Sequence, residues 1–199
     1  MGFREIKEHL SCFSVGIAGA GGLGSNCAAS LVRCGIGSVI IADFDFVEKS
    51  NLNRQFYFQD QTGKPKTEAL KENLLRINPF LKISAHHVVV NSENAIELFR
   101  DCDVVVEAFD RADMKEMLIE ALQSSLPGTP IIVGSGVAGW GDNNSIKSRK
   151  IDDTLYVCGD ESTVISDDTP PMAPRVGIVS NMQANLVVEI LMNKKKKNS

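Results

Sequence analysis

The feature that most constrains the fold of this chain is a glycine-rich segment at residues 19–24, which reads GAGGLG. It follows an apolar run at residues 15–18 and opens a helical stripe of apolar residues at Leu23, Cys27 and Leu31. Strand, glycine turn and helix in this order form the first unit of a nucleotide-binding α/β fold. The glycines that we assign to a nucleotide site are Gly19, Gly21, Gly22 and Gly24.

The residue types around this turn suit phosphate and ribose. Glycine lets the backbone turn tightly and approach a phosphate, and the N–H groups at a helix N-terminus attract anions. A second buried strand is predicted at residues 38–42, and Asp43 follows it as a carboxylate that can accept hydrogen bonds from ribose hydroxyls. Taken alone, this pattern favours a dinucleotide-dependent dehydrogenase, which is its commonest use.

Strands and helices continue to alternate along the rest of the chain. The periodicity predicts strands at 83–89, 104–106 and 131–133, and helices at 66–77, 92–99 with Ser92 as N-cap, 114–122 and around 179–190. This order predicts a Rossmann-like, doubly wound α/β fold with a mostly parallel sheet. Antiparallel strands are expected toward the C-terminal part, near 145–150 and 154–157, within a single domain over residues 1–199.

Composition excludes several classes of protein. A net charge of −4 argues against a nucleic-acid binder, because phosphate-backbone affinity needs clustered basic residues. The chain has no apolar stretch long enough for a membrane span and no signal-peptide pattern, so we expect a cytoplasmic protein without a membrane partner. Its five cysteines form no C-x-x-C pair, so we expect free thiols and no zinc. The basic run at 194–197 reads as a solvated tail.

Two long irregular segments are candidates for functional loops. Residues 44–65 are polar with several aromatic residues, and loops of this length in compact domains are usually functional. Residues 159–175 are acidic and contain prolines, which predicts a mobile surface loop before the last helix.

Ordered motifs in and around these loops point to one family. They are DFD at 43–45, SNLNRQ at 50–55, GKPK at 63–66, VVEAFD at 105–110 and MAPRVG at 172–177. At these residues the sequence resembles the ThiF/MoeB/HesA family, relatives of the ubiquitin-activating enzymes. The resemblance implies an adenylyltransferase that uses ATP to adenylylate the C-terminal Gly-Gly carboxylate of a ubiquitin-like sulfur-carrier protein. The carrier expected from it is of the ThiS type of thiamine biosynthesis.

The same resemblance implies roles for individual residues. Asp43 would hold the ATP ribose, and Asn51, Arg54 and Lys66 would contact the triphosphate. Asp110 would bind Mg²⁺. These types suit the reaction, because the attacking carboxylate is already ionised and catalysis consists mainly of neutralising two anions that are brought together. Lys64 is an alternative to Lys66, because Pro65 makes the local register uncertain.

Two further residues follow from the family pattern. Family members form dimers in which an N-terminal arginine of one subunit serves the other, and in the expected homodimer Arg4 is the candidate. Cys158 lies near the position where some members carry a cysteine for sulfur transfer, although a small buried apolar role is the simpler reading.

Other functions stay open from the sequence. Carriers of the molybdopterin type, a small-molecule carboxylate and a tRNA-bound carboxylate are alternative substrates. An NAD-dependent oxidoreductase would explain the glycines and Asp43 but not Arg54, Lys66 or Asp110. A non-catalytic scaffold subunit is the third class, and the intact charged residues speak against it.

Overall fold

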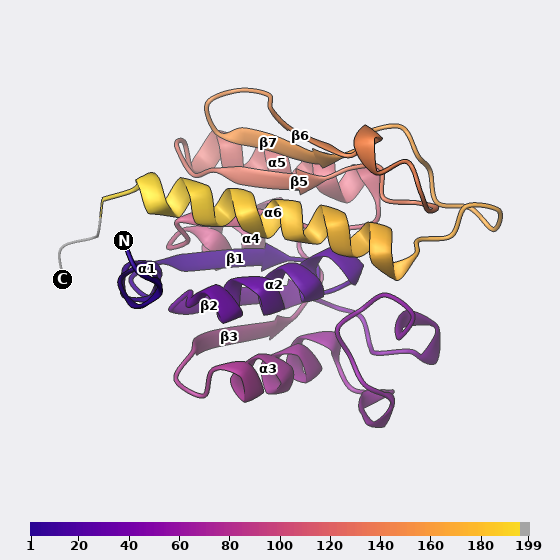
Figure 1. Cartoon of the computed structure of the whole chain (residues 1–199), viewed down its shortest axis with the longest axis horizontal. Helices are drawn as coiled ribbons and strands as arrows, with labels where there is room; N and C mark the ends of the chain where they lie inside the picture. Colours follow the sequence, from indigo (N-terminus) through magenta and orange to yellow (C-terminus); the bar gives the residue numbers. More distant parts are fainter. Residues whose placement is uncertain (196–199) are drawn as a thin grey trace.

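The protein is built on one seven-stranded sheet, seen in a computed structural model that describes residues 1–195 (Figure 1). The strands are β1 (Ser14–Ala18), β2 (Ser38–Asp43), β3 (Lys82–His87), β4 (Val104–Glu107), β5 (Ile131–Gly134), β6 (Lys147–Lys150) and β7 (Leu155–Gly159). Their order in the sheet is β3-β2-β1-β4-β5-β7-β6, and every neighbouring pair is parallel except β6 and β7. The predicted Rossmann-like sheet with antiparallel strands in its C-terminal part is confirmed.

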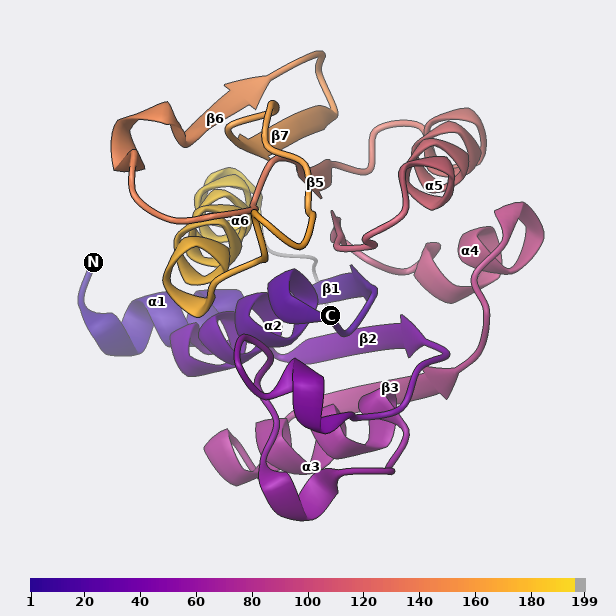
Figure 2. The same ribbon diagram turned by 90° about the vertical axis from the view of Figure 1, so that its right-hand side faces the viewer.

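Helices cover both faces of the sheet. They are α1 (Phe3–Leu10), α2 (Gly22–Cys34), α3 (Lys66–Ile77), α4 (Ser92–Phe99), α5 (Ala112–Ser125) and α6 (Ala173–Asn193). Figure 2 shows α1, α2 and α6 on one side of the sheet and α4 and α5 on the other. Helix α3 packs on α2 and β3. Because both faces are covered, β1, β4 and β5 are short apolar runs without polar alternation.

The segment between β2 and α3 is ordered by its own buried polar side chains. It contains two short 3₁₀ helices, η1 (Lys49–Asn51) and η2 (Gln59–Gln61). The buried Tyr57 hydroxyl donates to the Ala20 carbonyl at 2.6 Å, and Gln61 exchanges hydrogen bonds of 2.9 and 3.0 Å with Asn73 of α3. These contacts fix the loop against the glycine turn, so the side chains that it carries have defined positions.

Three local predictions need correction. No helix was expected before β1, but α1 forms there because α6 gives it an apolar surface, on which Leu10 is buried and His9 Nε2 lies 2.9 Å from the Leu191 carbonyl. Strand β3 ends at His87 rather than residue 89, since its neighbour β2 ends at Asp43, the residue paired with His87. The N-cap of α4 is Asn91, not Ser92.

The C-terminal region is more firmly held than its composition indicates. Lys194 Nζ pairs with Asp103 at 2.9 Å, so the basic run begins with an ion pair, whereas Lys196 and Lys197 lie outside the described residues. A third 3₁₀ helix, η3 (Asn143–Ser145), precedes β6.

Within residues 1–195, every helix is too short or too polar to cross a bilayer.

Candidate nucleotide-binding site

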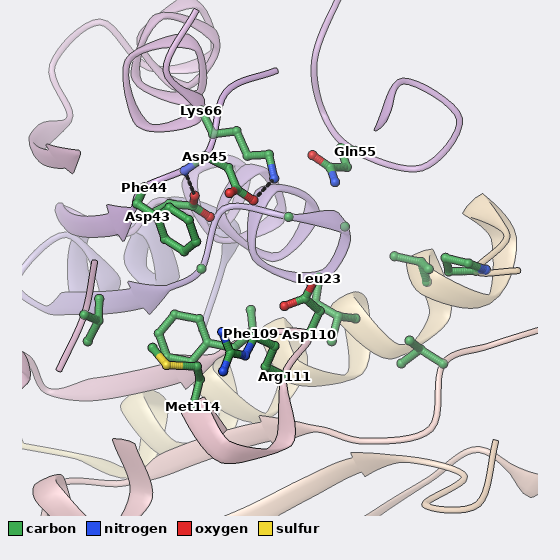
Figure 3. Close-up of a pocket in the computed structure, with 18 of the residues that line it drawn as sticks. Leu23, Asp43, Phe44, Asp45, Gln55, Lys66, Phe109, Asp110, Arg111 and Met114 are labelled. Atoms are coloured by element: carbon green, nitrogen blue, oxygen red, sulfur yellow. Dashed lines mark hydrogen bonds and ion pairs between the residues drawn. The ribbon is translucent and has the colours of Figure 1, made fainter. Parts of the chain in front are cut away.

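A cavity of about 450 Å³ opens where the central strands end and α2 begins. Its volume is within the range of small-molecule sites, and the carboxyl ends of parallel strands are where open α/β sheets bind ligands. Figure 3 shows Asp43, Phe44, Asp45, Lys66 and Gln55 on one side of the pocket, and Phe109, Asp110, Arg111 and Met114 on the other. The lining is completed by Gly19, Gly21, Gly22, Leu23, Arg54, Val88, Val89, Val90, Ala108, Val137, Ile165, Pro171 and Val176.

The glycine turn forms the floor of the pocket, and its close contacts with neighbouring backbone require glycine. Gly19 has φ +97°, and a Cβ there would lie 2.8 Å from the Ala108 carbonyl oxygen. A Cβ on Gly24 would lie 1.9 Å from the Gly19 oxygen, so Gly24 serves the close contact between α2 and the turn and does not line the pocket. Gly21 and Gly22 line it at the N-terminus of α2, where anions are favoured.

Asp43 ends β2 and is locked by backbone amides. Its Oδ2 accepts from the Ala20 N–H at 2.6 Å, and its Oδ1 accepts from the Asp45 N–H at 2.7 Å. Burial raises the pKa of the Asp43 carboxyl, and these hydrogen bonds and the charge of Lys66 act against that rise. The carboxylate is therefore fixed at the pocket wall, as the prediction of a ribose acceptor requires.

Lys66 brings a nearly buried ammonium to the same wall. Its side chain is 7% exposed, and Nζ lies 2.7 Å from Oδ2 of Asp45. Asp45 also accepts the Lys66 backbone N–H through its carbonyl at 2.8 Å. Lys64 points elsewhere and pairs with Glu72 at 2.9 Å on the surface, outside the pocket lining. Of the two lysines, the geometry favours Lys66.

Asp45 and Gln55 are site residues that the sequence reasoning did not assign. Both line the pocket, and each is the last residue of a motif, Asp45 of DFD at 43–45 and Gln55 of SNLNRQ at 50–55. Gln55 is buried, and its Oε1 has no hydrogen-bond partner among the described residues. A buried amide oxygen without a partner is costly, which is typical of a group that awaits a ligand.

The two other predicted phosphate ligands differ in position. Arg54 lines the pocket, with its guanidinium donating to the Ser50 carbonyl at 3.2 Å and to Asn53 Oδ1 at 2.8 Å. Asn51 is not part of the lining, and its Oδ1 accepts from the Glu48 N–H at 3.1 Å at the start of η1. The structure therefore brings Arg54, but not Asn51, to the cavity.

Asp110 is an exposed carboxylate just beyond the end of β4, and Figure 3 shows it turned into the pocket. A buried neighbour fixes the turn that carries it. Glu107 is fully buried, accepts from the Phe109 N–H at 2.6 Å and pairs with Lys115 at 2.8 Å. Burial raises the pKa of Glu107, and the ion pair with Lys115 acts against that rise.

The residues fit a magnesium ion of the kind that accompanies nucleotide phosphates. Mg²⁺ keeps several waters and typically takes one or two carboxylates besides phosphate oxygens. Asp110 offers such a carboxylate in reach of solvent, whereas Asp43 is engaged by amides and Asp45 by Lys66. Within residues 1–195, no group of three or more His, Cys, Asp and Glu side chains could by itself hold a metal.

Two predicted residues lie away from the pocket of their own chain. Arg4 is on α1, where Figure 1 shows the N-terminus at the edge at which β1 starts, and it pairs with Glu8 at 3.4 Å. Cys158 is fully buried in β7 and does not line the pocket. Burial raises the pKa of the Cys158 thiol to about 12, so the thiolate needed for sulfur chemistry is disfavoured.

The pocket as a whole can bind a nucleotide with its phosphates at the glycine turn. Apolar side chains from the ends of β2, β3 and β4, including Phe44, Val89 and Phe109, suit a purine ring. Asp43 is fixed beside them, Arg54 lies next to Gly22 at the start of α2, and Lys66 pairs with Asp45. Such a set stabilises negative charge that develops on a phosphate, which is the main task in nucleotidyl transfer.

Known proteins match this chain over most of its length. The model of the ThiF family matches residues 3–199. A "Sulfur carrier protein adenylyltransferase" of Thermus thermophilus is 37% identical over 132 residues, 66% of this chain and 48% of that protein. A "Sulfur carrier protein ThiS adenylyltransferase" of Bacillus subtilis is 39% identical over 143 residues, 70% of this chain and 41% of that protein. The chain thus spans less than half the length of these relatives.

A solved structure shares the fold. The E. coli tRNA N6-threonylcarbamoyladenosine dehydratase TcdA, solved in complex with ATP, superposes with a TM-score of 0.85. The match covers 94% of this chain and 89% of that one, at 19% sequence identity. At that identity the likeness concerns the fold alone.

Proposed function

The chain belongs to the ThiF family, and we propose that it uses ATP to adenylylate the C-terminal carboxylate of a ubiquitin-like sulfur-carrier protein of the ThiS type, releasing pyrophosphate. The observation that carries the proposal is the joint position of Arg54, Lys66 and Asp110 around one pocket that starts at the glycine turn. The names of the relatives, which are sulfur-carrier adenylyltransferases, support the substrate class.

The proposed reaction asks little proton chemistry of the protein. The carrier carboxylate is ionised at neutral pH and attacks the α-phosphate directly, with pyrophosphate as the leaving group. Two anions must approach each other, so the cations at Arg54 and Lys66 and the amides at the start of α2 lower the barrier by neutralising charge. Asp43 orients the ribose, and Asp45 holds Lys66 at the pocket wall until phosphate is bound.

A magnesium ion would supply the remaining positive charge on the triphosphate, with Asp110 as its protein ligand. We further propose that the unpartnered Oε1 of Gln55 accepts a hydrogen bond from a hydroxyl group of the bound nucleotide. Three further points stay predictions. They are a single domain over residues 1–199, a cytoplasmic location, and a homodimer in which Arg4 of one protomer reaches the site of the other.

A nicotinamide dinucleotide is the competing ligand for the glycine turn. Its two phosphates would offer Lys66 and Arg54 less negative charge than the triphosphate of ATP offers. Titration calorimetry with ATP–Mg²⁺ and with NADH compares the two directly. Tighter binding of NADH would replace the proposal with an oxidoreductase.

The decisive test is ATP–pyrophosphate exchange with Mg²⁺, with and without B. subtilis ThiS as the Gly-Gly-ended carrier. Exchange that depends on the carrier is the expected result, because only reversible formation of an acyl-adenylate returns label to ATP. Exchange with a molybdopterin-type carrier, and none with ThiS, would change the carrier type. No exchange with any carrier would leave a small carboxylate or a scaffold role.

A matched pair of variants tests the site. Asp110→Asn should lower exchange by at least about a hundredfold while the thermal midpoint stays unchanged, because an exposed metal ligand adds no core packing. Asp101→Asn, which alters an exposed carboxylate before the start of β4, should be fully active. Full activity of Asp110→Asn would remove Asp110 from the site.

A further inference from the structure

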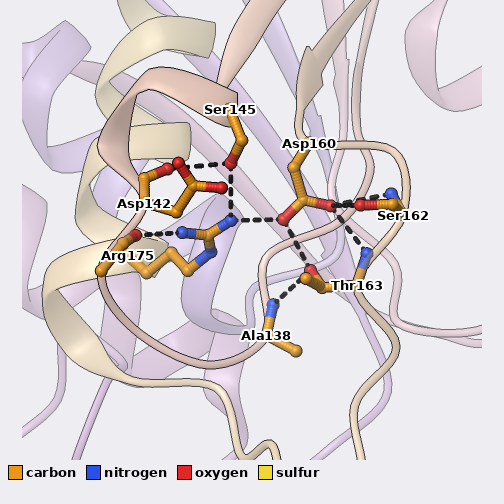
Figure 4. A network of polar contacts seen from close by, with 8 residues as sticks. Ala138, Asp142, Ser145, Asp160, Ser162, Thr163 and Arg175 are labelled. Atoms are coloured by element: carbon orange, nitrogen blue, oxygen red, sulfur yellow. Dashed lines mark hydrogen bonds and ion pairs between the residues drawn. The ribbon is translucent and has the colours of Figure 1, made fainter.

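A buried ion pair joins three segments on the far side of the pocket (Figure 4). Arg175, in the first turn of α6, is 5% exposed and pairs with Asp160, whose side chain is 2% exposed. The guanidinium also donates to the Gly141 carbonyl at 2.5 Å and to Ser145 Oγ at 3.3 Å. Arg175 thereby ties the start of α6 to the loop after β5 and to the loop after β7.

Asp160 spreads the same network along the loop after β7. Its Oδ1 accepts from the N–H groups of Ser162 and Thr163, both at 2.7 Å, and its Oδ2 accepts from Thr163 Oγ1 at 2.8 Å. Thr163 Oγ1 in turn accepts from the Ala138 N–H at 3.2 Å. The segment at residues 159–175, which the sequence predicts to be mobile, is therefore anchored at its first residues and at its end.

Each part of the network lies next to an apolar residue that lines the pocket. Those residues are Val137, Ile165, Pro171 and Val176. Val137 adjoins Ala138, Val176 adjoins Arg175, and Ile165 follows Thr163 closely. Pro171 forms an isolated bridge with Gly139, whose N–H donates to the Pro170 carbonyl at 3.0 Å. We call these four lining residues the far wall; the network and the bridge anchor the chain next to each of them.

The far wall faces the phosphate end of the pocket rather than the base and ribose end. Asp43 ends β2 and residues 88–90 follow β3, toward one edge of the sheet, whereas the far wall lies after β5, after β7 and in the first turn of α6. Val176 lies against the glycine turn, since a Cβ on Gly22 would be 3.0 Å from Val176 Cγ1. A nucleotide that fills the first half leaves the far wall to the second substrate.

We propose that Asp160 and Arg175 are positioning residues for the second substrate, a clasp that fixes the far wall against which the carrier's C-terminal segment lies beside the α-phosphate. This inference rests on the proposed function, because it assigns the far wall to the carboxylate partner of that reaction. The clasp touches neither ATP nor the reacting atoms. Its effect is on the affinity and alignment of the carrier.

The chain carries a built-in reporter of the clasp. Trp140 is the only tryptophan, is 70% exposed, and lies between Gly139 and Gly141, which the network and the bridge to Pro171 hold. Its fluorescence anisotropy should fall when the clasp is loosened, because the loop then moves within the excited-state lifetime. This readout needs neither ATP nor carrier.

The test compares graded variants in the full chain. Arg175→Lys keeps a positive charge beside Asp160 but loses the second guanidinium nitrogen, which donates to the Gly141 carbonyl. Thr163→Val removes the two hydrogen bonds that Oγ1 makes to Asp160 and to the Ala138 N–H, from an exposed residue. Arg175→Ala is the severe variant, and it is used only where its unfolding transition shows a folded protein, because it leaves Asp160 buried and unpaired. Arg149→Ala, which removes an exposed pair with Glu161 on the same loop, is the matched control.

Arg175→Lys and Thr163→Val should lower the anisotropy of Trp140 and raise KM for B. subtilis ThiS by about tenfold or more in pyrophosphate exchange. In calorimetry their Kd for ATP should stay within about twofold of the Kd of the unmodified chain, and Arg149→Ala should change neither constant.

A rise in the Kd for ATP that equals the rise in KM would assign the network a general structural role and overturn the inference. An unchanged KM for the carrier in a variant with lowered Trp140 anisotropy would overturn it as well. No exchange by the unmodified chain would remove the proposed function, and this inference with it, before any variant is compared.

Discussion

The closest contact in the glycine turn gives a prediction whose sign is set by the structure. A Cβ on Gly24 would lie 1.9 Å from the Gly19 carbonyl oxygen and 3.1 Å from Ile17 Cγ2. Because the nearer atom is backbone, Gly24→Ala must move α2 away from β1. Overpacking of this kind costs about 3 kcal/mol at the upper end of its usual range. The higher helix propensity of alanine than of glycine offsets about 1 kcal/mol of this loss in stability. The net expected loss is about 2 kcal/mol.

Gly177→Ala is the matched control for this change. Gly177 also lies inside a helix, α6, and among residues 1–195 no atom would lie within 4 Å of a Cβ there. The same substitution should therefore stabilise the protein by about 0.5–1 kcal/mol. In a chain of this length, about 2 kcal/mol corresponds to a fall of about 4–8 °C in the thermal midpoint.

Thermal and urea unfolding of both variants measure the difference, and ATP calorimetry reports on the site. Gly24→Ala should also bind ATP more weakly, because the phosphate amides at the start of α2 move with the helix. A Gly24→Ala protein as stable as the Gly177→Ala protein would show that α2 relaxes without cost. The account of the glycine turn as a forced close contact would then be wrong.

Three shorter predictions follow from the same structure. Lys66→Met should weaken ATP binding by about tenfold or more and leave an unpaired Asp45, which calorimetry measures; unchanged affinity would place the phosphates elsewhere. Cys158→Ala should retain pyrophosphate exchange, and at neutral pH iodoacetamide should label the exposed Cys12 but not the native Cys158; labelling of Cys158 in the folded chain would contradict its burial. Hydrogen bonds from Thr163 and Arg175 lower the pKa of Asp160 despite its burial, so its contribution to stability is full above the unfolded pKa of about 3.9 and is lost as pH falls toward the folded value. Asp160→Asn should flatten the acid limb of a stability–pH curve, and an unaltered limb would refute the assignment.

Periodicity and motif order determined the elements that local chemistry controls. The glycine turn between an apolar strand and an amphipathic helix predicts β1 and α2, and the bounds predicted for α3 and α4 agree with the structure. The same local signals failed where another element decides. Helix α1 has only a short apolar stripe at Phe3, Ile6 and Leu10 and packs on α6, and β3 ends where its neighbour β2 stops.

The site divides in the same way. Gly19, Asp43, Arg54, Lys66 and Asp110 could be named from the sequence, because each stands in a motif at the end of a strand or in the loop after it. The pairing of Lys66 with Asp45 could not, since charge complementarity between two motifs appears only when the loop closes on α3.

By itself, the sequence determined the fold class, the order of the elements and the residue types that suit a nucleotide, since these depend on patterns within one strand, turn or helix. Only the tertiary structure decided that Cys158 is fully buried, that Asn51 stays outside the cavity, and that Asp160 meets Arg175 from the opposite end of the loop between β7 and α6. The physical reason is that burial and ion pairing depend on neighbours distant in the sequence. The sheet brings them together only after its crossovers are formed.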